Sequence, residues 1–116
     1  MNTLPLCPRL QLQVPIYIDQ IMYLEGQGNY TKLFMINGKQ MLLSINIGLF
    51  DELLPHSAFI RLNKTYIVSL QSVDDWTYIN ARTLIIQLPG GNKIEVSRRR
   101  VECVKNRLEQ TKPIKK

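Results

Sequence analysis

The sequence predicts a single, mostly β domain of antiparallel strands with two short helices. Alternating apolar residues and turn-forming residues recur along most of the chain, whereas helical spacing of apolar residues appears at two places. A length of 116 residues allows one domain with a substantial core and does not suffice for two. The 45% share of hydrophobic residues is typical of a globular protein.

Strand patterns fill the N-terminal part. Residues 10–18 alternate with a period of two, and Pro15, which has no N–H to donate, makes an edge strand the expected role. A short strand is expected over residues 21–25. Strands over residues 30–36 and 40–43 flank Asn37-Gly38, which favours a tight hairpin because both residues tolerate positive φ.

A short helix should follow this hairpin. Asn46 suits its N-cap, since its side-chain oxygen accepts a bond from a free N–H of the first turn, and Pro55 ends it. Its apolar residues are Leu49, Phe50, Leu53 and Leu54.

More strands are expected in the second half, over residues 59–62, 66–70, 73–79, 83–88 and 93–96. Asn80-Ala81 lies near one turn, and Pro89-Gly90-Gly91-Asn92 forms another. The aromatic residues alternate within these patterns, which favours core packing over stacking on single-stranded nucleic acid. This applies to Phe50, Phe59, Trp76 and Tyr78.

A basic helix is expected at the C-terminal end. Ser97 is predicted to cap it through its hydroxyl, and Arg98-Arg99-Arg100 form its first turn. It should fade by Pro113 into a basic tail of residues 111–116. One apolar seam would hold it against the core, with Arg99 pointing away. The seam consists of Val101, Val104 and Leu108.

Positive charge is concentrated in the second half. Residues 1–55 hold three Lys or Arg and four Asp or Glu, a net −1, and residues 56–116 hold twelve and five, a net +7. Such a basic half suits a polyphosphate, an anionic membrane surface or an acidic protein, and charge alone does not separate them. Because arginine's planar fork matches phosphate oxygens and guanine edges, nucleic acid is the first partner to consider.

Cysteine usage and hydropathy favour the cytoplasm. Cys7 and Cys103 form neither a disulfide framework nor a zinc-binding spacing. No apolar run approaches the ~18 residues of a membrane span, and the N-terminus lacks the pattern of a signal peptide. We therefore expect a cytoplasmic protein with no membrane partner.

Enzyme chemistry has little support. His56 is the one histidine and follows a helix-ending proline, without a motif that would make it a base or a ligand. The pairs Asp51-Glu52 and Asp74-Asp75 are adjacent, so their side chains point apart. We expect no catalytic residues, no metal site and no cofactor.

Several segments, in this order, resemble the LytTR family of DNA-binding domains from bacterial response regulators. They are residues 21–25, 28–32, 50–54, 59–70 and 94–99, and the resemblance covers about residues 14–110. It implies an elongated arrangement of small antiparallel sheets with two short helices. It also implies binding to double-stranded DNA through loops entering successive major grooves. Repeated promoter sites would be occupied by two copies, a possible homodimer on DNA, with bending of the duplex.

The resemblance implies three DNA-contacting segments. They are Asn29, Tyr30, Thr31 and Lys32, then Asn63, Lys64 and Thr65, and finally Ser97, Arg98 and Arg99. The family often has histidine followed by arginine or lysine where this chain has Asn63-Lys64, so the preferred bases remain open. The usual receiver domain has no counterpart here, so the chain is expected to be a stand-alone regulator or a fragment.

Each segment also has a purely structural interpretation. Arg98 and Glu102 are spaced for an i,i+4 ion pair on a solvated face. Lys64 could be a solvated turn residue, Tyr30 could pack at a sheet edge, and Arg61 could be a surface charge.

The prediction is thus a sequence-specific DNA-binding transcriptional regulator with base contacts from Asn63, Lys64, Arg99 and one residue of 29–32. The alternative is a protein-interaction domain that kept the fold and lost specific DNA binding. A further alternative is non-specific binding of RNA or a membrane surface through the basic tail.

Overall fold

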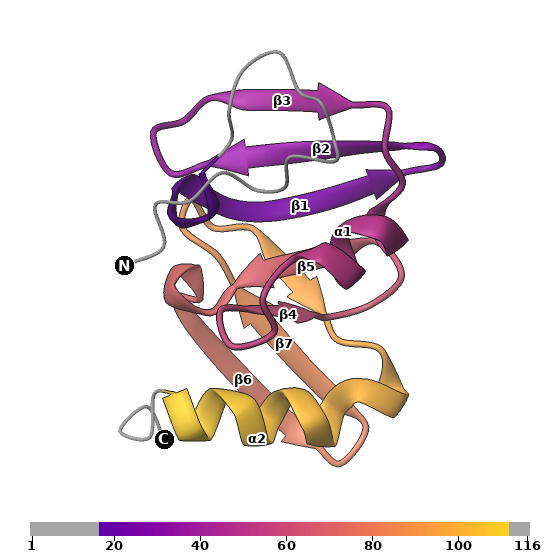
Figure 1. Ribbon diagram of the computed structural model, residues 1–116. Helices are drawn as coiled ribbons and strands as arrows, with labels where there is room; N and C mark the ends of the chain where they lie inside the picture. Colours follow the sequence, from indigo (N-terminus) through magenta and orange to yellow (C-terminus); the bar gives the residue numbers. More distant parts are fainter. Residues whose placement is uncertain (1–16, 112–116) are drawn as a thin grey trace.

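Two antiparallel sheets and two α-helices make up the fold of residues 17–111, the part of the chain that the computed structural model describes (Figure 1). The five-stranded sheet has the order β3-β2-β1-β5-β4, and the three-stranded sheet has the order β6-β7-β8. The strands are β1 (Ile21–Gln27), β2 (Tyr30–Met35), β3 (Gln40–Leu43), β4 (Phe59–Arg61), β5 (Tyr66–Ser69), β6 (Asp75–Asn80), β7 (Thr83–Gln87) and β8 (Lys93–Glu95). The helices are α1 (Ile47–Leu53) and α2 (Val101–Thr111), with 3₁₀ turns at Ile18–Gln20, Leu70–Ser72 and Arg98–Arg100.

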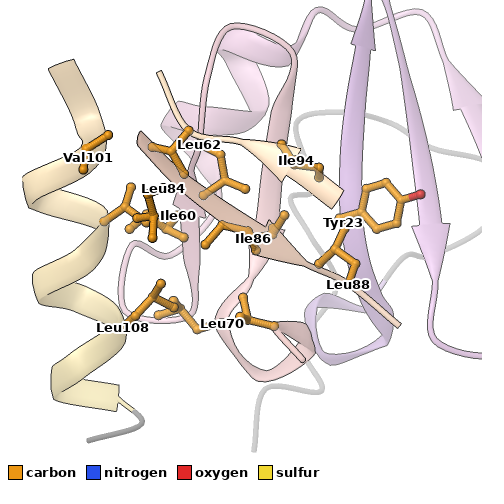
Figure 2. Close-up of a cluster of buried hydrophobic side chains, with 14 residues drawn as sticks. Tyr23, Ile60, Leu62, Leu70, Leu84, Ile86, Leu88, Ile94, Val101 and Leu108 are labelled. Carbon is orange, nitrogen blue, oxygen red and sulfur yellow. The ribbon is translucent and has the colours of Figure 1, made fainter. Parts of the chain in front are cut away.

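Strands β4 and β5 separate two hydrophobic cores. Successive side chains of a strand point to opposite faces, so Phe59 and Ile67 enter one core while Ile60 and Val68 enter the other. The first core lies between the five-stranded sheet and α1, where Phe50 is fully buried. The second joins both sheets to α2 (Figure 2). Strands β4 and β5 therefore fix both helices relative to one scaffold.

Turn chemistry explains the hairpins. The hairpin predicted at Asn37-Gly38 is confirmed, with Gly38 at φ +91°. Because the last paired residues are Phe34 and Gln40, its loop is longer than a two-residue turn. Gly90 and Gly91 have φ +92° and +88° and connect β7 to β8, as predicted.

The N-cap prediction for α1 is confirmed. The backbone N–H of Leu49 donates to Asn46 Oδ1 at 2.9 Å, and Asn46 itself is extended. This bond satisfies one of the free donors of the first turn.

Other predictions need correction. Ser97 does not cap α2 through its hydroxyl, because the chain passes from Ser97 into a 3₁₀ turn over Arg98–Arg100 before the helix begins at Val101. Tyr78 is not in the core: its side chain is 44% exposed, and Lys105 Nζ lies 4.9 Å from its ring centroid. The predicted edge strand of residues 10–18 lies mostly outside the described residues, and Ile18 begins a 3₁₀ turn.

The first strand packs closely against α1. A Cβ atom on Gly26 would lie 2.9 Å from Ile47 Cγ2, closer than van der Waals contact allows.

No helix within residues 17–111 is both long and apolar enough to pass through a bilayer.

Gly26→Ala should lower the free energy of unfolding by about 1–3 kcal/mol, because the added methyl group overpacks the contact between β1 and α1. Urea denaturation measures the change. In an Ile47→Ala background, Gly26→Ala should lower the free energy of unfolding by less, because the Cγ2 atom that the new methyl group would contact is absent. An equal cost in both backgrounds would contradict this packing account.

Tyr23 links the five-stranded sheet to the β7–β8 turn, and Tyr66 links two neighbouring strands of the five-stranded sheet. Tyr23 stacks on Phe34 with ring centroids 4.3 Å apart and accepts a bond from Asn92 Nδ2 at 3.2 Å. Tyr66 donates its hydroxyl proton to Glu25 Oε2 at 3.1 Å. Burial raises the pKa of the Tyr66 phenol above its ordinary value, and Glu25 raises it further through the hydrogen bond and its charge.

Stability should therefore fall as the pH rises above about 10, the unfolded-state pKa of tyrosine, since the unfolded chain loses phenolic protons that the folded chain keeps. Tyr66→Phe should make this decline shallower in pH-dependent thermal melts. An unchanged alkaline slope would show that the Tyr66–Glu25 contact does not contribute.

Candidate nucleic-acid interface

The first predicted segment begins at a two-residue turn. Gln27 pairs with Tyr30, so Gly28 and Asn29 form the tip between β1 and β2, with Gly28 at φ +66°. Asn29 is exposed and Tyr30 is 47% exposed, so both side chains are available to a ligand.

The next two residues lie within strand β2 rather than in a loop. Thr31 is fully buried, and its hydroxyl donates to the backbone oxygen of Ile45 at 2.5 Å. The Thr31 side chain therefore holds β2 against the segment before α1. Its predicted DNA contact stays a prediction. Lys32 is half-buried, with Nζ 5.5 Å from the Phe34 ring centroid.

The second predicted segment is the loop between β4 and β5. Asn63 Oδ1 accepts the backbone N–H of Thr65 at 2.8 Å and of Tyr66 at 2.9 Å. Asn63 Nδ2 donates to the backbone oxygen of Glu95 at 2.8 Å. The Asn63 amide therefore organises the loop through bonds at both ends. Its predicted base contact stays a prediction.

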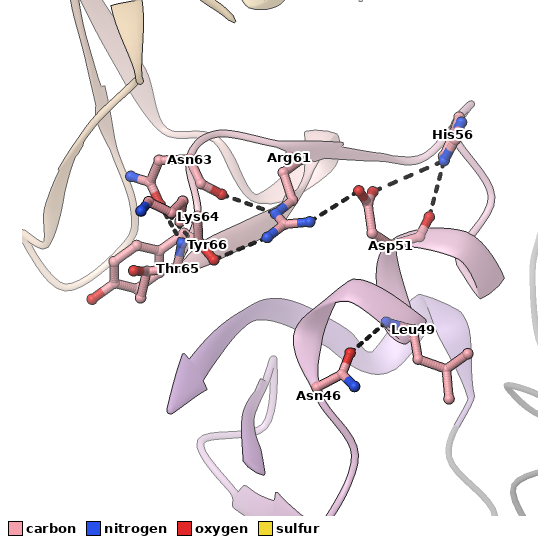
Figure 3. Close-up of polar contacts among 9 residues, drawn as sticks. All are labelled: Asn46, Leu49, Asp51, His56, Arg61, Asn63, Lys64, Thr65 and Tyr66. Carbon is pink, nitrogen blue, oxygen red and sulfur yellow. Dashed lines mark hydrogen bonds and ion pairs between the residues drawn. The ribbon is translucent and has the colours of Figure 1, made fainter. Parts of the chain in front are cut away.

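Lys64 occupies the exposed position of this loop, and the Arg61 side chain lies beside its backbone, to the right in Figure 3. The Arg61 guanidinium donates to the backbone oxygens of Asn63 at 2.9 Å and Lys64 at 3.0 Å. It also donates to Asp51 Oδ2 on α1 at 3.1 Å. Arg61 is thus a bracing residue and not only a surface charge, and no local motif in the sequence indicates Asp51 as its partner.

The third predicted segment is the turn into α2. Arg98 and Arg99 are exposed, and Arg100 is half-buried. The ion pair between Arg98 and Glu102 that the spacing allows is not formed within residues 17–111. Ser97 is half-buried, and its hydroxyl oxygen lies inside the protein, so its predicted DNA contact would have to come from the backbone.

Hydrogen bonds join the three segments. The N–H of Gly26, at the end of β1, donates to Thr65 O at 2.7 Å. The N–H of Ser97 donates to Leu62 O at 3.0 Å, and Asn63 adds its bond to Glu95. The segments therefore lie along one side of the molecule, the right-hand side in Figure 1. We call the exposed residues Asn29, Lys64, Arg98 and Arg99 the basic edge.

The geometry of the basic edge favours binding over catalysis. It presents three cationic side chains and one amide on short, braced turns. Within the described residues, no group of three His, Cys, Asp or Glu side chains is arranged to hold a metal ion.

Comparison with known proteins identifies the family. The model of the LytTr DNA-binding domain matches residues 12–109. The chain belongs to the LytTr DNA-binding domain family. DNA is accordingly the partner of this domain, and the family predicted from the sequence motifs is confirmed.

A solved structure confirms the fold. The chain is similar to the LytTr DNA-binding domain of a protein described as a methyl-accepting/DNA response regulator from Bacillus cereus. The two share 21% sequence identity with a TM-score of 0.71, over 82% of this chain and 86% of the other. The predicted LytTR-like arrangement of antiparallel sheets with two helices is thus correct. No curated protein matches the chain.

Asn63→Ala should lower the free energy of unfolding by about 2 kcal/mol, because it leaves two backbone N–H groups and one carbonyl without their partner. Lys64→Ala should leave stability within about 0.5 kcal/mol of the parent, since Lys64 is exposed. Chemical denaturation of both variants checks this. Equal stabilities of the two variants would contradict the bracing role of Asn63.

Proposed function

We propose that this domain is a transcriptional regulator that recognises specific double-stranded DNA sequences through its basic edge. The observation that carries the proposal is the hydrogen bonding that gathers three separate segments along one side of a LytTr scaffold. Phosphate contacts fix the register of a protein on DNA, and contacts to base edges supply the specificity. Because the edge offers exposed amide, ammonium and guanidinium groups, it has donors for both tasks.

The residues divide between these tasks by their geometry. Arg99 and Lys64 are exposed cations on braced turns, which suits hydrogen bonding to guanine in a major groove. Asn29 stands at the hairpin tip, where its amide suits adenine. Tyr30, Lys32, Thr65 and Arg98 would contact phosphates or sugars, with salt-dependent affinity from counterion release.

Two copies of the domain would occupy repeated promoter sites and bend the duplex between them, as a possible homodimer on DNA. In this account the domain acts in the cytoplasm by recognition alone, without catalysis, and takes no membrane partner. The formal net charge of +6 supports association with a polyanion.

A protein-interaction domain that has lost specific DNA binding is the alternative. Its strongest support is that two predicted contact residues, Thr31 and Asn63, have their side chains engaged within the protein. The exposure of Arg99 and Lys64 favours DNA recognition instead.

Selection from a random-duplex library should recover a preferred sequence for the parent chain. Arg99→Ala should weaken binding to that sequence by about 1–3 kcal/mol and relax the preference at the position it contacts. Fluorescence anisotropy measures both affinities. Arg82→Ala, an exposed arginine on the turn between β6 and β7, is the matched control and should change little.

Removing residues 112–116 should weaken binding to all sequences alike, because lysines in a tail contribute through charge. If this truncation abolished binding while Arg99→Ala had no effect, non-specific binding through the tail would replace the proposal. A parent chain that selected no duplex at all would favour the protein-interaction alternative.

A further inference from the structure

A cationic groove of about 450 Å³ lies between α1 and α2, beside the basic edge. Its charged or polar wall consists of Asp51, His56, Arg61, Arg99, Arg100 and Arg107. Four arginines and one aspartate give this wall a net charge of +3 when His56 is neutral. Its remaining lining is largely apolar, including Phe59, Ile60 and Val104.

The four arginines are not equally available. The Arg61 guanidinium already donates to Asp51 and to two backbone oxygens. Arg107 donates from Nη2 to the backbone oxygen of His56. By contrast, the guanidinium groups of Arg99 and Arg100 make no hydrogen bond or ion pair within residues 17–111. The groove thus contains two guanidinium groups with free donors.

Positive charge beside apolar groups attracts an anion more strongly than the same charge in open water, because the local dielectric constant is lower. Asp51 does not remove this attraction, since its carboxylate is already paired with Arg61 at 3.1 Å. A guanidinium fork fits a phosphate group with two parallel hydrogen bonds. The vacant donors therefore match a phosphate better than a single-point anion.

We propose that the groove between α1 and α2 binds a phosphate group, held by Arg99 and Arg100. The phosphate would belong either to the DNA backbone or to a small phosphorylated molecule. If it belongs to DNA, this inference rests on the proposed function and extends the interface past the basic edge to α2. Arg99, which lines the groove and also belongs to the basic edge, would then stand at the border of the two.

Inorganic phosphate is the probe for the site itself. In NMR titrations of the full chain without DNA, phosphate should shift the signals of Arg99, Arg100 and Cys103 in a saturable way. Arg100→Gln should abolish the saturation, and Arg82→Gln, which removes an arginine distant in sequence from the groove lining, should preserve it. Thermal melts establish that both variants fold.

The salt dependence of duplex binding separates the two sources of phosphate. If DNA supplies the phosphate, Arg100→Gln should reduce the slope of log K against log salt by about one unit and weaken all duplexes alike. Arg100→Lys, which keeps the charge, should restore the slope. Saturable phosphate binding with an unchanged slope would assign the site to a small phosphorylated molecule.

The proposal is overturned if Arg100→Gln changes neither the phosphate titration nor the salt slope. A parent chain that binds no duplex would refute the proposed function, and the phosphate titration would still decide on the groove. Shifts at the groove with an acidic peptide and none with phosphate would also overturn it, in favour of a protein partner.

Discussion

The loop between β4 and β5 is the part on which the rest of the proposed interface depends. It is bonded on one side to the end of β1 through Gly26 and Thr65, and on the other to the turn before α2 through Leu62 and Ser97. Asn63 and Arg61 add side-chain bonds that fix its backbone. These bonds join three segments from distant parts of the chain directly to one another.

This constraint also assigns a role to α1, which contributes no residue to the basic edge. Asp51 on α1 receives a bond from Arg61, and Arg61 in turn holds the carbonyl of Lys64. The loop is therefore connected both to a helix and to the core that the helix covers. Such bracing reduces the conformational entropy that an interface loop loses when it binds, which favours specific contacts.

Local sequence signals predicted much of the fold, whereas side-chain roles depended on distant partners. Asn46, Asn37-Gly38 and Gly90-Gly91 act through their own neighbours, so the cap and both hairpins could be predicted. The burial of Thr31 could not, because it depends on the strand beginning at Tyr30 and on a carbonyl 14 residues away. The bond from Asn63 to the backbone could not be predicted either, because its acceptor, the carbonyl of Glu95, lies 32 residues later in the chain.

Amide chemical-shift mapping with a selected duplex tests the central claim most directly. Our account predicts that the largest changes occur together at Asn29, Lys64, Arg98 and Arg99, with little change at the β6–β7 turn. The claim would be contradicted if the duplex perturbed the β6–β7 turn and the free edge of β3 while leaving those four residues unchanged.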